Sequence, residues 1–250
     1  MLTELRRGAT TYYLLGTAHV SKASIAEVRT TLEELRPEVV CVELDQTRLD
    51  ALSGKKKPGL AEARKLVGEG KLLYLLAQLT LAAYQKRIGK RLGVRPGAEM
   101  LEAIDVAKTI DARIALIDRD IDVTLRRAWA ALSLGQRAML AASFTIGLAK
   151  TGPITEDMVE QLKDNKARAE VIDELARALP EIKSAVLDER DKYMISKMIE
   201  AAGGAKRVVA VVGAAHVPGM TAAFDLAIDR RALERIPSPS LIARTLSRLA

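Results

Sequence analysis

The two histidines of this sequence, His19 and His216, lie in nearly identical five-residue stretches. Residues 16–20 read Gly-Thr-Ala-His-Val, and residues 213–217 read Gly-Ala-Ala-His-Val. Glycine makes up about 7% of an average chain, so finding it three positions before both histidines is roughly a 0.5% coincidence. Imidazole groups bind metal ions and transfer protons near neutral pH. The matched spacing therefore indicates that the two histidines share one active or metal-binding site.

Carboxylates close two apolar runs of the chain in a similar way. Glu43 and Asp45 end one run, and Asp118 ends another. A carboxylate in a buried strand is costly unless it is paired, protonated or bound to a cation. For Glu43 the simplest partner would be Arg48, one helical turn further on. The other interpretation is a metal site, because two imidazoles and one carboxylate are the three protein ligands of a catalytic centre with a position open for water.

Four apolar, β-branched segments bounded by turn residues are expected to form the buried strands that carry these side chains. They are residues 10–15, 39–44, 113–117 and 208–212. A helical pattern over residues 22–35 joins the first two, which predicts a strand–helix–strand crossover. Ligands bind at the carboxyl edge of open α/β sheets, and a glycine that ends a strand allows a sharp turn with positive φ. We therefore expect the four strand ends to deliver the histidines and carboxylates to one rim.

The remaining sequence is mostly helical in pattern. Helical insertions are predicted over about residues 60–108 and 123–202, and a final helix over residues 220–233. Residues 238–250 read as a Pro-Ser linker followed by a short basic helix. Residues 1–237 are thus expected to form one α/β domain, with a central parallel or mixed sheet and long helical insertions between its strands.

Composition narrows the classes of function. Of the 250 residues 49% are hydrophobic and 28% are charged, which supports a packed core and argues against disorder. The net charge of +7 is accompanied by only eight aromatic residues, so no nucleic-acid partner is expected. The single cysteine, Cys41, lies in an apolar run and is expected to be a buried packing residue. Neither residues 72–84 nor residues 128–149 form a transmembrane span by the usual criteria, although either could support a homodimer.

A second charged cluster occupies residues 188–194 within a helical pattern. Glu189 and Tyr193 share a helix face there, because they are four positions apart. Taken alone, such a cluster is typical of a solvated helix face. Arg126 and Arg127, which precede Trp129, are likewise expected to be ordinary surface cations.

Together these stretches resemble the TraB/PrgY family, which is related to the Tiki-type membrane metalloproteases and to the erythromycin-esterase and ChaN-like proteins. The resemblance extends over residues 10–237 and keeps the order of the motifs. They are residues 15–21 (LGTAHVS), 42–45 (VELD) with Arg48, 97–99 (GAE), 118–121 (DRDI) with Thr124, Leu125 and Trp129, 189–191 (ERD) with Tyr193 and Met194, and 211–219 (VVGAAHVPG). The resemblance implies an α/β fold with a metal-dependent peptidase centre. It implies a divalent ion, manganese or cobalt, with zinc as an alternative.

Carried over by position, the resemblance implies that His19, Glu43 and His216 bind the metal. It also offers Glu189 or Asp118 as the carboxylate that manages protons. The supporting residues that it implies, without a defined role, are Arg48, Glu99, Arg119, Arg190, Asp191 and Tyr193. Members of the family look like pheromone-shutdown factors, which limit a secreted peptide signal.

The first functional hypothesis is therefore a metal-dependent hydrolase that acts on a peptide. One alternative is a binding module that sequesters a peptide or a metal without turnover, and another is a metal-free hydrolase with a histidine as general base. TraB/PrgY proteins usually continue into transmembrane helices, whereas this sequence stops at Ala250. We thus expect the cytoplasmic domain of a membrane protein, associated with the membrane through that further C-terminal region.

Overall fold

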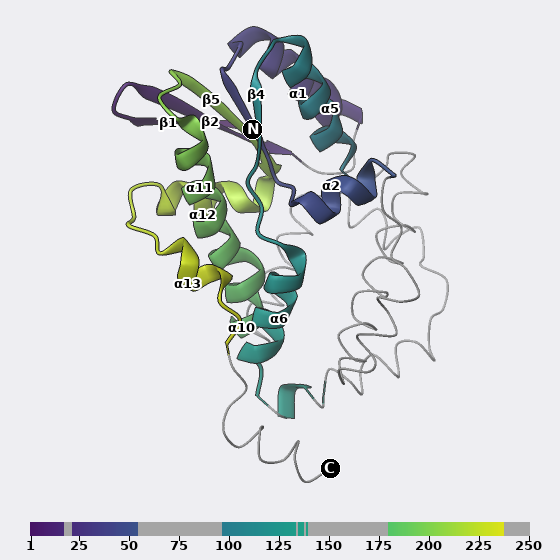
Figure 1. Cartoon of the computed structure of the whole chain (residues 1–250), viewed down its shortest axis with the longest axis vertical. Helices are drawn as coiled ribbons and strands as arrows, with labels where there is room; N and C mark the ends of the chain where they lie inside the picture. Colours follow the sequence, from purple (N-terminus) through teal and green to yellow (C-terminus); the bar gives the residue numbers. More distant parts are fainter. Residues whose placement is uncertain (18–21, 55–96, 134, 138, 140–179, 238–250) are drawn as a thin grey trace.

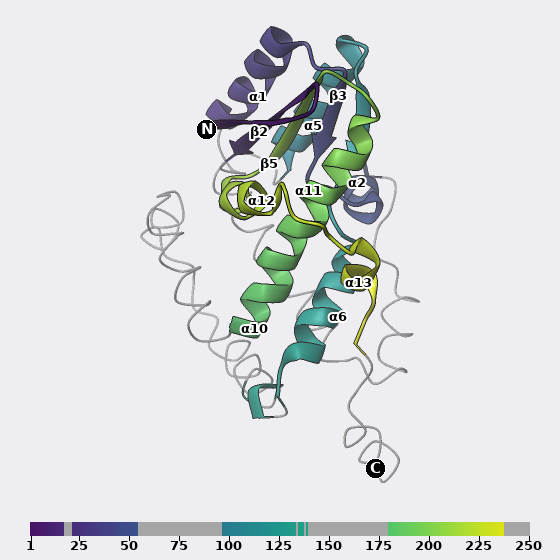
Figure 2. The same ribbon diagram turned by 90° about the vertical axis from the view of Figure 1, so that its left-hand side faces the viewer.

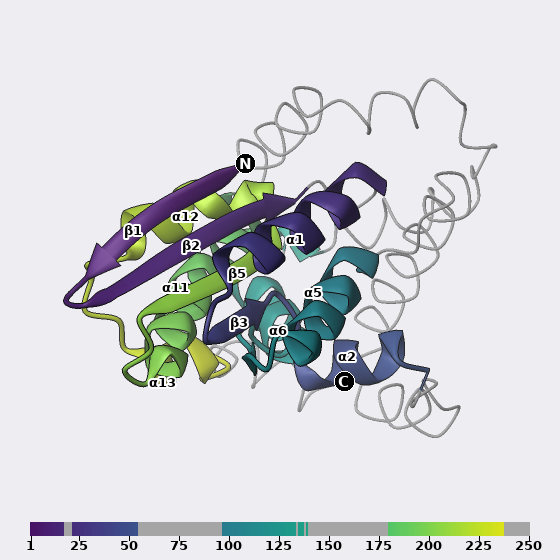
Figure 3. The same cartoon turned by 90° about the horizontal axis from the view of Figure 1, so that it is seen from above.

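The computed structural model describes residues 1–17, 22–54, 97–133, 135–137, 139 and 180–237 of the chain. Within these ranges it shows an α/β fold, in which a mixed sheet of five strands is covered by helices on both faces (Figures 1 and 3). The expected fold class is therefore confirmed. Most of the predicted helical insertions, residues 55–96 and 140–179, and the C-terminal residues 238–250 lie outside the described residues.

The sheet has the strand order β1-β2-β5-β3-β4. Its strands are β1 (Leu2–Arg7), β2 (Thr10–Thr17), β3 (Val39–Val42), β4 (Arg113–Leu116) and β5 (Arg207–Gly213). All neighbours except β1 and β2 run parallel, so β2, β3, β4 and β5 end at the same edge. The register pairs Gly16 with Val212 and Thr17 with Gly213. Both Gly-x-x-His stretches therefore begin side by side.

Strand β1 was not assigned from the sequence. It pairs antiparallel with β2 through a tight turn in which Gly8 adopts a φ of 60°. Its side chains alternate weakly, since Thr3 and Leu5 are half-buried while their neighbours are exposed. A mostly exposed edge strand that carries two arginines lacks the apolar run by which the other four strands were found.

Each face of the sheet has its own apolar core. Helices α1 (Lys22–Leu35) and α5 (Ala98–Thr109) cover one face, where Leu32 and Met100 join Val40 and Val211. Helices α11 (Glu189–Ala202) and α12 (Val217–Ala223) cover the other (Figure 3). There Met194, Met198 and Met220 pack with Val212 and the fully buried Cys41. Burial raises the pKa of the Cys41 thiol to about 12, as expected for a packing residue.

Most helical segments fall in the predicted tracts, but α2 (Gln46–Leu52), which follows β3, lies before them. Between β4 and β5 lie α6 (Ile121–Ala131), α10 (Pro180–Lys183) and the π-helix η1 (Ser184–Asp188), and the 3₁₀ turn η2 (Ala214–His216) follows β5. The single helix expected over residues 220–233 is wrong. The chain leaves α12 at Phe224, whose ring packs edge-on to Tyr12, and restarts as α13 (Arg230–Glu234). Asp229 caps that restart by accepting a hydrogen bond from the Ala232 amide at 3.2 Å.

Helix α11 extends well beyond the sheet. Through η1 and α10 it continues away from the strands and runs beside α6, with α13 close to both (Figure 2). The first residues of α11 thus lie where the strand ends, α6 and α13 meet. Among the described residues no helix is long and apolar enough to cross a bilayer.

Candidate functional site

The carboxyl ends of β3, β4 and β5 bring three predicted site residues together. Glu43 follows β3, Asp118 follows β4 by one residue, and His216 ends η2 after β5. All three are buried, with relative exposures of 4–6%. The Glu43 Oε2 atom accepts a hydrogen bond of 2.6 Å from the Gly213 amide, which fastens the end of β3 to that of β5. The predicted convergence of strand ends is present for these residues, whereas His19 lies outside the described residues.

The glycines of the two Gly-x-x-His stretches serve a different purpose from the one expected. Gly213 has a φ of −61°, and Gly16 is not among the residues with positive φ. A Cβ on Gly16 would lie only 3.2 Å from the Ala214 Cα atom and 2.9 Å from the Val217 Cγ2 atom. Gly16 is therefore needed because the two stretches pack closely against each other, not because the backbone turns sharply.

Asp191 holds the ring of His216. The Nδ1 atom of His216 and the Oδ1 atom of Asp191 are 2.5 Å apart, and both residues are buried. Burial opposes the charged ring, but the Glu43 carboxylate and the Asp191 hydrogen bond outweigh it and raise the pKa of His216 to about 9. The pKa of Asp191 is also raised, chiefly by its burial. The dyad leaves Nε2 of His216 facing Glu43, with 3.3 Å between Nε2 and Oε1.

Gly219 makes this dyad possible, although no role beyond its place in the motif was predicted for it. A Cβ at position 219 would lie 1.9 Å from the Asp191 Oδ2 atom and 2.7 Å from its Cγ atom. Because α12 has no side chain at that point, the carboxylate of Asp191 can approach the helix and still reach His216. The sequence feature that could have pointed to this role is the pair Pro218-Gly219, which follows His216 and Val217.

Arg190 joins the three strand ends. Its Nε and Nη2 atoms donate to the two oxygens of Asp118 at 2.9 and 2.7 Å, and Nη2 also donates to Glu43 Oε1 at 2.6 Å. Its Nη1 atom lies 3.2 Å from both the Val186 carbonyl and the His216 Nε2 atom. Burial disfavours this charge, yet the two carboxylates more than compensate and raise the pKa of Arg190.

The expected ion pair between Glu43 and Arg48 is wrong. Glu43 pairs with Arg190, 147 positions away, and Arg48 instead pairs with Asp118 at 2.7 Å. Asp45 caps α2 by accepting the Arg48 amide through Oδ1, while its buried Oδ2 has no hydrogen-bond partner among the residues that the structure describes. Burial accordingly raises the pKa of Asp45.

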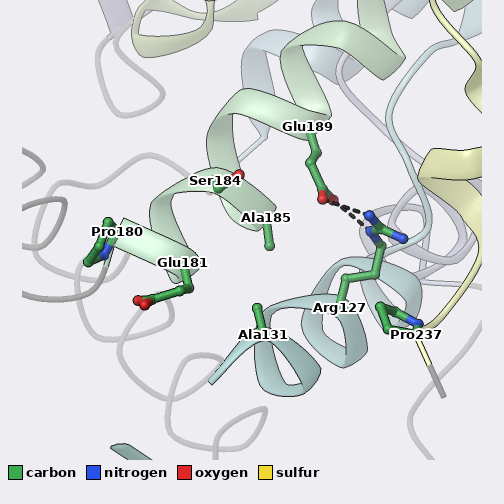
Figure 4. A pocket seen from close by; sticks show the side chains of 8 residues that line it. All are labelled: Arg127, Ala131, Pro180, Glu181, Ser184, Ala185, Glu189 and Pro237. Carbon is green, nitrogen blue, oxygen red and sulfur yellow. Dashed lines mark hydrogen bonds and ion pairs between the residues drawn. The ribbon is translucent and has the colours of Figure 1, made fainter. Parts of the chain in front are cut away.

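A second ion network lies on the other side of α11. The Glu189 carboxylate accepts hydrogen bonds of 2.7 Å from Arg119 Nη1 and from Arg127 Nε and Nη2. Burial alone would raise the pKa of Glu189, but the two guanidinium groups prevail and lower it. Arg127, expected to be an ordinary surface cation, has a side chain only 15% exposed. Figure 4 shows the Arg127–Glu189 pair at the edge of a cavity of about 500 Å³ between α6 and η1.

The other supporting residues have distinct positions. Arg119 is 1% exposed and also donates to Thr124 Oγ1 and to the carbonyls of Ala185 and Leu233. The Tyr193 hydroxyl donates to Glu234 in α13 at 3.1 Å, and burial together with that carboxylate raises the pKa of Tyr193 to about 12. Glu99 is buried in the first turn of α5.

The donor atoms of Glu43 and His216 fit two positions of a divalent-metal site. Two ligands about 2.1 Å from one ion with tetrahedral angles lie about 3.4 Å apart, and Glu43 Oε1 and His216 Nε2 are 3.3 Å apart. A carboxylate on the other ring nitrogen, as supplied by Asp191, is the usual partner of a metal-binding histidine. Within the described part of the chain no group of three His, Cys, Asp or Glu residues could hold an ion, so a third ligand has to come from elsewhere.

Comparisons with known proteins agree with this architecture. A sequence model of the TraB/PrgY/gumN family matches residues 1–229. An uncharacterized protein of Methanocaldococcus jannaschii is 35% identical over 208 residues, which cover 83% of this chain and 52% of that protein. The TraB domain-containing protein of Homo sapiens is 32% identical over 262 aligned residues, covering 95% of this chain and 69% of the human protein. The chain thus spans about half the length of the archaeal relative and about two thirds of the human one.

Proposed function

Because the chain belongs to the TraB/PrgY/gumN family, we propose that it is a metal-dependent hydrolase that acts on a peptide. The observation that carries the proposal is the approach of Glu43 Oε1 and His216 Nε2 to 3.3 Å, with Asp191 holding the other ring nitrogen. His19 would supply the third ligand. A bound divalent ion would lower the pKa of a water molecule and polarise the peptide carbonyl.

The chain's own residues prepare this site in defined ways. Metal binding requires the neutral His216 ring, and a hydrogen bond from Nδ1–H to Asp191 then places the lone pair on Nε2, the atom nearest Glu43. The Gly213 amide fixes the Glu43 carboxylate through Oε2 and leaves Oε1 toward the histidine. Both ligands are thereby oriented before any ion arrives.

Of the two carboxylates offered for proton transfer, we assign Asp118. It shares the Arg190 guanidinium with Glu43 and therefore lies in the same cluster as the proposed ligands. Glu189 is gripped by Arg119 and Arg127, which keep it ionised and hold the start of α11. Its role in this proposal is to support the helix that presents Arg190 and Asp191.

The test combines metal analysis with peptide hydrolysis. We expect about one divalent ion per chain after supplementation with manganese, cobalt or zinc, and chelator-sensitive cleavage of a mixed peptide library read by mass spectrometry. Glu43→Gln keeps the shape and an acceptor for Gly213 but removes the charge, and His216→Ala removes a ligand, so both should lose metal and cleavage. Arg126→Gln, on the exposed face of α6, is the matched control and should keep both. A supplemented protein with no bound metal and no cleavage would contradict the proposal.

A second candidate is supported by a different observation. The Asp191–His216 dyad is complete without an ion, and Arg190 already pairs with Glu43 and Asp118. Such a dyad can act as a general base toward water once the ring has lost its proton, which the raised pKa of His216, about 9, places at alkaline pH. In that case cleavage should persist in excess chelator and disappear in both His216→Ala and Asp191→Ala, which separates this candidate from the first.

A further inference from the structure

The Arg190 guanidinium contacts the two atoms that the proposed function assigns to the metal. Its Nη2 atom is 2.6 Å from Glu43 Oε1, and its Nη1 atom is 3.2 Å from His216 Nε2. We infer that Arg190 is a built-in cation that competes with the divalent ion for these two ligands and thereby sets the affinity of the site. This inference rests on the proposed metal site, and it concerns what the chain itself does to metal binding.

Competition at the histidine is one of position. The Nη1 atom of Arg190 lies 3.2 Å from Nε2, the ring atom that would bind a metal, and a guanidinium can only donate hydrogen bonds. An ion bound to Nε2 would therefore face a positive charge at short distance. At Glu43 a carboxylate oxygen has two lone pairs, but the 2.6 Å contact places a full positive charge next to Oε1. Like charges repel, so an ion bound to Oε1 and a guanidinium at that distance oppose each other.

Arg190 keeps other hydrogen-bond partners when it releases these two ligand atoms. Two of its contacts go to Asp118, at 2.9 and 2.7 Å, and form a bidentate pair that involves neither ligand. The carbonyl of Val186, in the π-helix η1, lies 3.2 Å from Nη1 and can take that donor over from the histidine. Exchange therefore costs Arg190 two contacts and leaves its charge paired within the buried cluster.

The net charge of the cluster favours a cation at the two ligand atoms, whether this is the Arg190 guanidinium or a divalent ion. The connected group contains three carboxylates, those of Glu43, Asp118 and Asp191. It contains two arginines, Arg190 and Arg48. Metal binding requires a neutral His216, and with that ring neutral the five groups sum to one negative charge. Removing Arg190 raises the net negative charge of the group to two. A divalent ion is the cation best suited to compensate that charge. The arginine should therefore weaken metal binding while it stabilises the metal-free protein.

The experiment measures metal affinity directly by calorimetry, with Mn²⁺ and Zn²⁺ as separate probes. We compare the wild-type chain with Arg190→Gln, Arg190→Lys and the matched control Arg126→Gln, which removes an arginine that pairs with Asp122 of the same helix. Arg190→Gln should bind the ion about 5- to 100-fold more tightly, a usual range for coupled sites. Arg190→Lys keeps the charge but lacks the fork that spans both ligand atoms, so its affinity should lie in between. The control should match the wild type.

Thermal denaturation gives an independent readout. In chelator, Arg190→Gln should melt well below the wild type, and the metal should raise its melting temperature by more than it raises that of the wild type. If Arg190→Gln does not fold in chelator, it is prepared with metal, and Arg190→Lys carries the comparison. Metal affinity that is unchanged or weaker in both variants would overturn the inference, because Arg190 would then orient the ligands instead.

The outcomes also separate this inference from the proposed function. Tight binding in the wild type with no gain in the variants overturns the inference alone. Binding seen only after Arg190 is replaced supports the competition but contradicts a metal-dependent wild-type enzyme. Absence of binding in every variant overturns both.

Discussion

Two neighbouring ion clusters are built from the same two dipeptides, Asp118-Arg119 and Glu189-Arg190. Asp118 pairs with Arg190 at the strand ends, and Arg119 pairs with Glu189 toward α6 and α13. Glu189 and Arg190 point about 100° apart on α11, and Asp118 and Arg119 lie at the bend that follows β4, so the partners are exchanged between the two sides. Two acidic-basic dipeptides, one after β4 and one at the start of α11, thus form two adjacent ion clusters.

The clusters differ in which charge is in excess. At the strand ends the carboxylates outnumber the arginines, and Glu43 and His216 turn their donor atoms toward each other. Around Glu189 the arginines outnumber the carboxylate, and the surplus donors of Arg119 are taken up by main-chain carbonyls. An excess of buried carboxylate invites a cation, whereas arginines satisfied by carbonyls hold elements together. The first cluster is therefore the candidate for chemistry, and the second is structural.

The largest expected effect comes from removing the centre of the structural cluster. Arg119→Met should lower the free energy of unfolding by about 3–5 kcal/mol, because it breaks the buried ion pair with Glu189 and removes the hydrogen bonds to the Ala185 and Leu233 carbonyls. Urea denaturation checks this value. Arg126→Met is the control, since Arg126 forms a half-exposed pair with Asp122 within α6 and should cost less than about 1 kcal/mol. Equal losses in the two variants would show that the Glu189 cluster does not hold these elements together.

Much of the fold could be predicted from the sequence because its signals are local. The β-branched runs gave β2, β3, β4 and β5, and parallel strands that end at one edge bring Glu43, Asp118 and His216 together. Strand β1 was missed because its exposed edge position leaves it without an apolar run. The break between α12 and α13 was missed because it depends on Phe224 packing against Tyr12, a contact across 212 positions of the chain.

The pairing of side chains within the site could not be predicted from the sequence either, because the partners are far apart in the chain. Arg48 is nearest to Glu43 in the chain, yet Arg190 reaches it across 147 positions because α11 packs over the strand ends. Arg127 looked like a surface cation, since its partner Glu189 is 62 positions away. Gly16 was recognised as important, but the reason is close packing against Ala214, and the packing of Gly219 against Asp191 was not predicted at all, because both contacts exist only in the assembled fold.

A smaller effect is expected from filling the space beside Asp191 in the first cluster. Gly219→Ala places a methyl group 1.9 Å from the Asp191 Oδ2 atom, so the carboxylate has to move away from His216. Overpacking of this kind costs about 1–3 kcal/mol, and losing the partner of a metal-bound histidine lowers metal affinity about 10- to 100-fold. Urea denaturation and calorimetry measure the two quantities.

A double-mutant cycle identifies the cause of the Gly219 effect. Asp191→Ala removes the atoms that the new methyl group would meet most closely, so Gly219→Ala should cost little in that background. If Gly219→Ala is equally costly with and without the Asp191 carboxylate, the clash lies in the backbone of α12. The claim that this glycine serves the chemical cluster would then be wrong.

The smallest effect distinguishes the clusters by pH. Burial opposes the ionised form of Glu189, but Arg127 and Arg119 prevail, so its pKa in the folded chain lies below the usual value. A carboxylate with a lowered folded pKa contributes its full stability above the ordinary glutamate pKa of about 4.3 and loses it as the pH falls through the lowered value. At pH 7 Glu189→Gln should therefore cost about 1 kcal/mol, the difference between charged and neutral hydrogen bonds.

Urea denaturation of wild type and Glu189→Gln from pH 7 down to pH 3 measures this difference. The difference in the free energy of unfolding should be constant above about pH 5. It should shrink at lower pH, because the wild-type carboxylate becomes protonated there whereas the glutamine does not titrate. Metal affinity should be the same in both proteins at pH 7, since Glu189 contacts neither Glu43 nor His216 through its paired oxygens. A lower metal affinity in Glu189→Gln would show instead that the two clusters act as one unit through the adjacent Arg190.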